Sequence, residues 1–152
     1  MSLQEEAEIL RRIPLFAKLE PAKLKLLAFT SRRLAYDAGQ VLFNQGDTGD
    51  SAYIVLDGSA EISIATPNGP VVVATVARNG IIGEIAILCD VPRTATVTAK
   101  TDLHALRIDK ETFFRLVTEF PQMAVEIMRE LAQRLEKTNQ QLRAAIAARP
   151  AT

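Results

Sequence analysis

The chain has 152 residues but only one cysteine, Cys89, and one histidine, His104, and it has no tryptophan. A single cysteine excludes a disulfide framework and a cysteine-ligated metal site. A lone histidine without a partner in the sequence pattern is expected to be an ordinary strand residue, not a catalyst. Asp47 and Asp50 lie in a glycine-rich turn, but their spacing does not fit a calcium-binding loop. We therefore expect no metal and no cofactor.

An excess of charge of either sign is also missing, because 18 basic residues balance 18 acidic ones. Binding of nucleic acid through phosphate neutralisation normally requires a basic excess. We therefore expect no direct nucleic-acid binding by this chain. No apolar run approaches the length of a membrane span, and no signal peptide is visible. The expected compartment is the cytoplasm.

The N-terminal residues show a helical pattern. Within residues 2–12 apolar side chains recur on one face, and acidic residues occupy the first turns, where the helix dipole favours them. Pro14 ends this helix, and residues 13–16 form a short apolar segment. Pro21 suits the first position of a second helix, which the pattern predicts over residues 21–28.

Residues 34–109 have the pattern of short strands. Alternating apolar and polar residues at 61–64 indicate a half-buried antiparallel sheet. Turn signals separate the strands at Asp37-Ala38-Gly39, Gly46-Asp47, Asp57-Gly58, Pro67-Asn68-Gly69 and Arg78-Asn79-Gly80.

A helical pattern returns after residue 109, and Pro121 splits it into helices at 110–119 and 122–147 within a C-terminal helical region, 110–148. The order of helices, strands and helices predicts an α+β fold. We expect an antiparallel, jelly-roll-like β-roll at 34–109, flanked by N-terminal helices and a long C-terminal helix. The length predicts a single domain over 1–152.

The most informative segment is 82–97, where Gly83 and Glu84 open a short apolar turn and Arg93 follows nine residues after Glu84, at the entry of a predicted strand. The first turn of a helix, here near Ile85 and Ala86, offers free backbone N–H groups to an anion. Gly83 allows the backbone to approach a ligand closely. The guanidinium of Arg93 matches two phosphate oxygens.

Glu84 cannot itself bind phosphate, because a carboxylate would repel it. A carboxylate beside an anion site commonly accepts a hydrogen bond from a ribose 2′-hydroxyl. Phosphate and ribose together indicate a nucleotide. Taken alone, Arg93 could be a surface arginine, and Glu84 could be an acidic residue stabilised at a helix start.

This segment resembles the phosphate-binding cassette of cyclic-nucleotide-binding domains, which occur in catabolite-activator-type regulators, protein kinase regulatory subunits and nucleotide-gated channels. The family pattern reads aromatic-Gly-Glu-x-Ala-Leu, a short loop, and then Pro-Arg-x-Ala-[Thr/Ser]-Val. Ile82 replaces the aromatic residue, as in catabolite-activator-type domains. The resemblance covers about residues 9–143 and includes the upstream Gly46-Asp47 and Asp57-Gly58 turns.

The resemblance implies a role for each cassette residue. The phosphate would contact Arg93, Thr94, Ile85 and Ala86, and the ribose would contact Gly83 and Glu84. A hydroxyl at the position of Thr94 reaches the guanine amino group in cGMP-preferring members, but many cAMP-binding members also carry one. The implied ligand is therefore cAMP or cGMP.

Three valines, Val71, Val73 and Val76, are candidates for flanking the base, although such residues are more often core residues. In the long last helix, apolar or small residues recur at alternating steps of three and four: Met128, Leu131, Leu135, Thr138, Leu142 and Ala145. This heptad pattern fits a dimer seam or a helix packed on its own domain.

The resemblance favours the homodimer. In catabolite-activator-type proteins an Arg-Leu-x-x-Thr-Ser segment of this helix places hydroxyls against the adenine amino group. Thr138 matches the threonine, and Asn139 stands where the serine would be. In channel-type domains an arginine near the position of Arg134 stacks on the base.

The resulting expectation is a cyclic-nucleotide sensor that repositions its C-terminal helix, and not an enzyme. Hydrolysis of a cyclic phosphate would need a metal cluster or a positioned base, and the sequence shows neither near the cassette. The alternative is a degenerate fold that serves as a protein-interaction scaffold without nucleotide. The resemblance also implies that the chain ends where a catabolite-activator-type regulator begins its helix-turn-helix.

Overall fold

The computed structural model describes residues 2–148, which form two compact units, one ending at Arg115 and the other beginning at Leu116. The α+β class is confirmed: helices precede and follow two antiparallel sheets. A single domain over 1–152 stays a prediction. No helix within residues 2–148 is long and apolar enough to cross a membrane.

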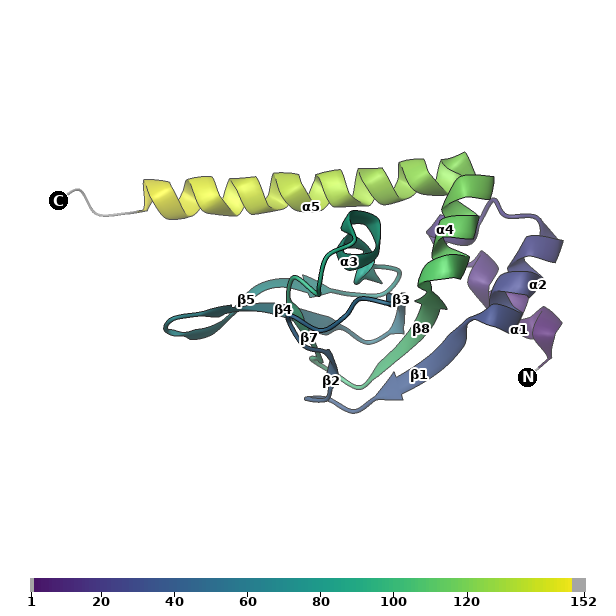
Figure 1. Ribbon diagram of the computed structural model, residues 1–152, viewed down its shortest axis with the longest axis horizontal. Helices are drawn as coiled ribbons and strands as arrows, with labels where there is room; N and C mark the ends of the chain where they lie inside the picture. Colours follow the sequence, from purple (N-terminus) through teal and green to yellow (C-terminus); the bar gives the residue numbers. More distant parts are fainter. Residues whose placement is uncertain (1, 149–152) are drawn as a thin grey trace. The chain divides into compact units, whose positions relative to one another are not determined.

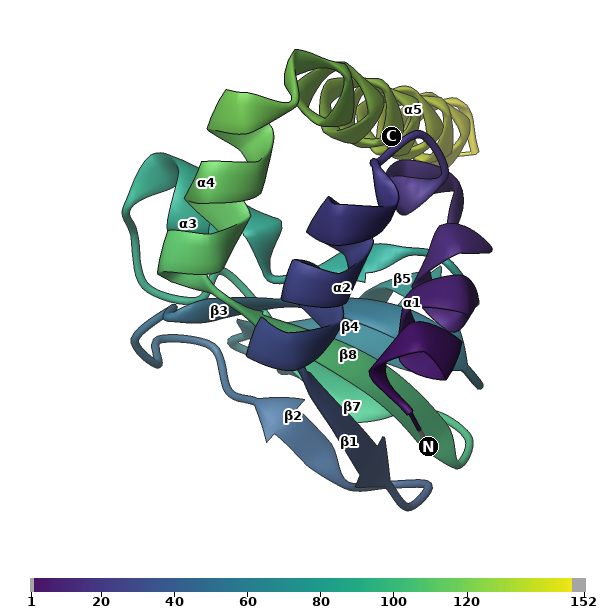
Figure 2. The ribbon, with the colours of Figure 1, turned by 90° about the vertical axis from the view of Figure 1, so that its right-hand side faces the viewer.

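Two helices and one helical turn form the N-terminal part: α1 (Leu3–Arg11), the 3-10 turn η1 (Pro14–Phe16) and α2 (Pro21–Thr30). The side chain of Ser2 caps α1 by accepting a hydrogen bond from the Glu5 N–H at 3.1 Å. Helices α1 and α2 pack side by side (Figure 2). The expected apolar segment at 13–16 is the η1 turn, and its Phe16 side chain is fully buried.

Eight strands form the β-roll as two four-stranded sheets (Figure 1). One sheet has the order β1-β8-β3-β6, and the other has the order β2-β7-β4-β5. Every strand pair is antiparallel. The strands are β1 (Arg32–Tyr36), β2 (Val41–Phe43), β3 (Ser51–Asp57), β4 (Ala60–Thr66), β5 (Gly69–Val76), β6 (Ile81–Ile82), β7 (Thr96–Ala99) and β8 (Leu103–Asp109).

The core of the roll comes from inward-facing apolar residues of both sheets, among them Val55, Val97 and Ala105. The strands β4 and β5 form a long hairpin (Figure 1), whose register shifts between Ile62 and Ser63. Such a bulge bends a strand and increases its twist. The predicted strand region began at 34, but β1 starts at Arg32, because the Ser31 N–H and hydroxyl end α2 on the Leu27 carbonyl.

Three further helices occur within the described residues: α3 (Glu84–Cys89), α4 (Lys110–Glu119) and α5 (Pro121–Ala147). The bounds predicted for α4 agree with the structure. Pro121 is the first residue of α5, not a break before it, because a helix needs no N–H donor at that position.

Candidate functional site

Gly83, whose backbone is in the left-handed conformation, determines where helix α3 of the cassette begins. Gly83 follows β6 with a φ of 84° and caps α3. A Cβ added at Gly83 would overlap the Arg93 Nη1 atom, so only glycine fits both the backbone and this neighbour. Glu84, the first residue of α3, is 1% exposed. The residues predicted for the ribose therefore lie directly beside the residue predicted for the phosphate.

Arg93 lies in an irregular segment that precedes a strand. The sequence placed Arg93 at the entry of a strand, but β7 begins only at Thr96. The reason is a different backbone pairing: the Arg93 N–H donates to the Asp47 carbonyl at 2.8 Å, and the Gly46 N–H donates to the Arg93 carbonyl at 2.8 Å. The turn at residues 46–47 thus fixes the backbone of Arg93.

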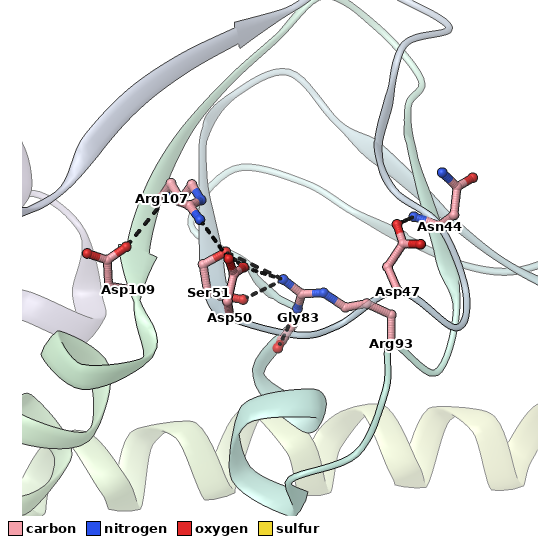
Figure 3. A network of polar contacts seen from close by, with 8 residues as sticks. All are labelled: Asn44, Asp47, Asp50, Ser51, Gly83, Arg93, Arg107 and Asp109. Carbon is pink, nitrogen blue, oxygen red and sulfur yellow. Dashed lines mark hydrogen bonds and ion pairs between the residues drawn. The ribbon is translucent and has the colours of Figure 1, made fainter.

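Arg93 is only 3% exposed, and two backbone carbonyls and one aromatic ring hold its guanidinium. Figure 3 shows the contacts with Gly83 and Ser51. Its Nη1 donates to the Gly83 carbonyl at 3.0 Å, and its Nη2 donates to the Ser51 carbonyl at 2.8 Å. Its Cζ lies 4.0 Å from the ring centroid of Phe43, a cation–π contact. Burial lowers the pKa of Arg93 from its ordinary value, but an arginine remains charged at neutral pH.

The buried Nε atom of Arg93 has no hydrogen-bond partner within residues 2–148. A guanidinium carries five N–H donors, so the two carbonyls leave several donors available. An unpaired buried donor is costly and rare in folded proteins. Arg93 is therefore a buried, oriented cation that an additional acceptor would satisfy.

Asp50 is the acidic neighbour of Arg93, and it is shared with Arg107 (Figure 3). One Asp50 oxygen lies 4.0 Å from the Arg93 Nη2, and the other lies 3.3 Å from the Arg107 Nη2. Arg107 also contacts Asp109 at 3.5 Å. Because the Asp50 side chain is largely exposed and the 4.0 Å contact is long, this carboxylate offsets the charge of Arg93 only weakly.

A second glycine, Gly49, allows helix α3 to lie close to the segment that precedes β3. A Cβ at Gly49 would overlap the Ala86 Cβ and would lie 3.6 Å from the Arg93 Nε. Ala86 is buried, whereas the side chains of Ile85 and Thr94 are exposed. Glu84 is the first residue of α3, so the free backbone N–H groups of the first helical turn begin at Glu84.

The valines predicted for the base differ in exposure. Val76 is 6% exposed and belongs to the core of the roll, whereas Val71 and Val73 are 47% and 42% exposed on β5. Val71 pairs in register with Ile64 of β4, which is also exposed. Val71, Val73 and Ile64 are therefore exposed apolar residues of the β4–β5 hairpin.

The α5 candidates belong to the other compact unit. Arg134, Thr138 and Asn139 lie on consecutive turns of α5, and the Arg134 Nη2 is 3.0 Å from the Glu130 Oε1. Thr138 is exposed. Their contact with a base stays a prediction.

Sequence reasoning missed two groups that hold Arg93, the ring of Phe43 and the carbonyl of Ser51. A three-residue strand gives no periodic signal for Phe43, and a backbone carbonyl has no sequence signature. Asp47 acts as a turn residue, as expected, because its Oδ2 accepts from the Asn44 N–H at 3.0 Å. No group of three or more potential metal ligands occurs in the part of the chain that the structure describes.

Comparison with known proteins places this arrangement in a family. The sequence model of the cyclic nucleotide-binding domain matches residues 33–120, more than half of the chain. The chain is 29% identical over 136 residues to a CRP-like cAMP-activated global transcriptional regulator of Mycobacterium tuberculosis, covering 89% of the chain and 61% of that protein. It is 34% identical to a cAMP-dependent protein kinase regulatory subunit of Schizosaccharomyces pombe, covering 80% of the chain and 28% of that protein.

Solved structures agree with this assignment. The cAMP-binding acyltransferase from Mycobacterium smegmatis is similar at a TM-score of 0.76 and 32% identity, over 89% of the chain and 42% of that structure. The chain spans less than two thirds of the length of the two curated relatives above. The matched region contains the β-roll, the Gly83 turn and Arg93. The chain therefore belongs to the cyclic nucleotide-binding domain family.

Proposed function

We propose that this chain is a cyclic-nucleotide sensor module. The observation that carries the proposal is Arg93, a buried guanidinium fixed by two carbonyls and a ring, with its Nε unpaired within residues 2–148. A cyclic phosphate supplies an anionic acceptor for this group. Charge-assisted hydrogen bonds of this kind are about twice as strong as neutral ones.

The cassette residues divide the ligand between them. The phosphate would bind Arg93 and the first turn of α3 at Ile85 and Ala86, with the exposed Thr94 at its side. The ribose 2′-hydroxyl would donate to Glu84, the buried residue that directly follows Gly83. This division separates the anionic and hydroxyl parts of the nucleotide.

The base would contact the exposed valines of the β4–β5 hairpin, Val71 and Val73. Val76 is the weakest of the three valine candidates, because core packing already occupies its side chain. Arg134, Thr138 and Asn139 would approach the base from α5. Because the ligand would then contact both units, it would favour one position of α5, and this shift would be the signal.

We propose cAMP as the first ligand to test, because the three relatives described above are named for cAMP. cGMP is the second candidate, since Thr94 provides a hydroxyl that can reach a guanine amino group. We propose a regulatory role in the cytoplasm, without catalysis and without direct nucleic-acid binding by this chain.

We also propose that α5 forms a homodimer seam. Met128, Leu135 and Leu142 are seven residues apart along the helix and are 60%, 62% and 57% exposed. Three large apolar side chains on one helical stripe fit a coiled-coil seam. A second copy of the chain offers the same stripe.

Thermal unfolding with cAMP, cGMP and 5′-AMP tests the proposed function. A ligand at one hundred times its dissociation constant stabilises the native state by about 2.7 kcal/mol. For a chain of this size, that corresponds to a rise of about 5–10 °C in the unfolding midpoint. We expect this rise with a cyclic nucleotide and not with 5′-AMP. An unchanged midpoint with both cyclic nucleotides would favour the interaction-scaffold alternative.

A further inference from the structure

A second concave site lies away from the cassette, within the unit that ends at Arg115. It is a cleft of about 360 Å³ bordered by the end of α1, strand β1, the end of β3, the turn after β5 and strand β8. We propose that this cleft binds a small organic anion that carries at least two negative charges as phosphate or carboxylate groups.

The charges that line the cleft are mostly positive. Arg12, Arg33 and Arg78 contribute three guanidinium groups from three separate elements, and Asp57 is the only carboxylate among the lining residues. This local excess contrasts with the zero net charge of the chain. Guanidinium groups match phosphate and carboxylate oxygens in a bidentate geometry.

The three arginines have no acidic partner within residues 2–148. Elsewhere in the chain, arginines such as Arg107 and Arg129 form ion pairs with nearby carboxylates. Three positive charges around one cleft that holds a single carboxylate, Asp57, repel one another. A bound anion would relieve this repulsion.

The backbone positions of the arginines are well defined. The turn that carries Arg78 is fastened to β3, because the Asn79 N–H donates to the Val55 carbonyl at 2.8 Å and the Val55 N–H donates to the Gly80 carbonyl at 3.0 Å. Arg33 is held in β1 by its register with Leu106 of β8. The side chains therefore start from fixed points around the cleft.

The position of Arg12 has an alternative explanation, since a cation at the carboxyl end of α1 favours the helix dipole. That explanation does not extend to Arg33 or Arg78, which belong to a strand and a turn. The cleft volume also lies within the range of about 300–1,000 Å³ that is typical of small-molecule sites. The three arginines are exposed, but they line one cleft and are not scattered over the surface.

The apolar lining indicates an organic ligand. Ile13 is buried, and Ile9 and Leu56 are half-buried at the wall of the cleft. Apolar walls with a few convergent polar groups are typical of sites for small organic molecules. The polar groups of the ligand would face the arginines, and its carbon skeleton would face these side chains.

The cleft and the cassette are separate sites. Ser51 at the start of β3 holds Arg93, whereas Asp57 at the end of β3 lines the cleft. A strand rises by about 3.3 Å per residue, so the ends of β3 are about 20 Å apart. A small anion in the cleft does not reach Arg93.

Calorimetric titration of the full chain with pyrophosphate, citrate and ADP in low-salt, phosphate-free buffer tests the proposal. Pyrophosphate and ADP represent phosphate sources, and citrate represents carboxylates. We expect saturable binding of at least one probe. Arg33→Gln and Arg78→Gln should each weaken it by about tenfold or more, because each removes charge-assisted hydrogen bonds.

The matched control is Arg32→Gln, because Arg32 is adjacent on β1 and points to the opposite face of the strand. Arg32→Gln should change the affinity for the anion by less than about twofold. Arg93→Gln should also change this affinity by less than about twofold, because Arg93 lies in the cassette. Thermal unfolding of each variant verifies that it is folded. The cleft variants should leave cAMP binding unchanged, so failure here is distinguishable from failure of the sensor proposal.

Two results would overturn the proposal. The first is the absence of binding by all three probes at millimolar concentration. The second is an affinity for the anion that Arg33→Gln and Arg78→Gln leave unchanged, since the anion would then bind elsewhere. If Arg93→Gln weakened the binding in that case, the anion would bind at the cassette.

Discussion

Replacement of Arg93 by alanine should nearly abolish cyclic-nucleotide binding. The side chain is 3% exposed, and it places a fixed charge beside the Gly83 turn. Truncation of one partner of a buried charge pair costs about 2–5 kcal/mol. At about 1.4 kcal/mol for each tenfold change, the affinity should fall by roughly thirty-fold to several thousand-fold.

The same substitution also lowers stability, and the two effects must be measured separately. Arg93→Ala leaves the carbonyls of Gly83 and Ser51 without their present donors. Each buried polar group without a partner costs about 1–3 kcal/mol, within a typical total stability of about 5–15 kcal/mol. We expect the variant to fold with a lower unfolding midpoint.

Calorimetry with cAMP and cGMP measures the affinity, and Arg107→Ala is the matched control. Arg107 shares Asp50 with Arg93, but its side chain is 24% exposed, and its contacts in Figure 3 are with Asp50 and Asp109, not with Gly83. The control should lose less than about threefold in affinity. A folded Arg93→Ala variant that also loses less than threefold would refute the assignment of the phosphate to Arg93.

Four further substitutions test other parts of the account. Glu84→Gln should reduce the preference for cAMP over 2′-deoxy-cAMP by about 1.5–3 kcal/mol in competition binding, and an unchanged preference would place the ribose contact elsewhere. Thr94→Ala should weaken cGMP more than cAMP in the same assay; equal losses would confine Thr94 to the phosphate. Gly49→Ala should weaken cyclic-nucleotide binding, because its Cβ would push Ala86 and helix α3 away. An unchanged affinity would show that the backbone at residue 49 can move without displacing α3. Leu135→Glu should convert a dimer into a monomer in sedimentation at micromolar concentration, and a parent that is monomeric with and without nucleotide would contradict the α5 seam.

The fold was predictable because the turn residues and the hydrophobic periodicity of the sequence agree with the strands and helices of the structure. Glycines with positive φ, such as Gly39, Gly46 and Gly58, lie in the turns between strands, where the sequence predicted turns. The helix bounds shifted by one or two residues at Pro121 and Thr30, since the ends depend on capping contacts that a pattern does not show.

The site was predictable only in part. The spacing of Gly83, Glu84 and Arg93 identified the residues, and the structure brings them together. The supports of Arg93 were not predictable, because Phe43 is 50 residues earlier in the chain and Ser51 acts through its backbone. Long-range contacts of this kind follow from strand pairing, which a single sequence does not specify.

The central claim is that a cyclic nucleotide binds at the Gly83 turn and the guanidinium of Arg93. Proton–nitrogen NMR of the labelled chain titrated with cAMP tests it most directly, because it follows the Arg93 Nε–Hε signal together with the backbone amides. We predict that the Nε–Hε signal and the amides of Gly83 to Ala86 shift together and saturate at one ligand per chain. A spectrum unchanged by millimolar cAMP and cGMP, or shifts confined to other parts of the chain, would contradict the account.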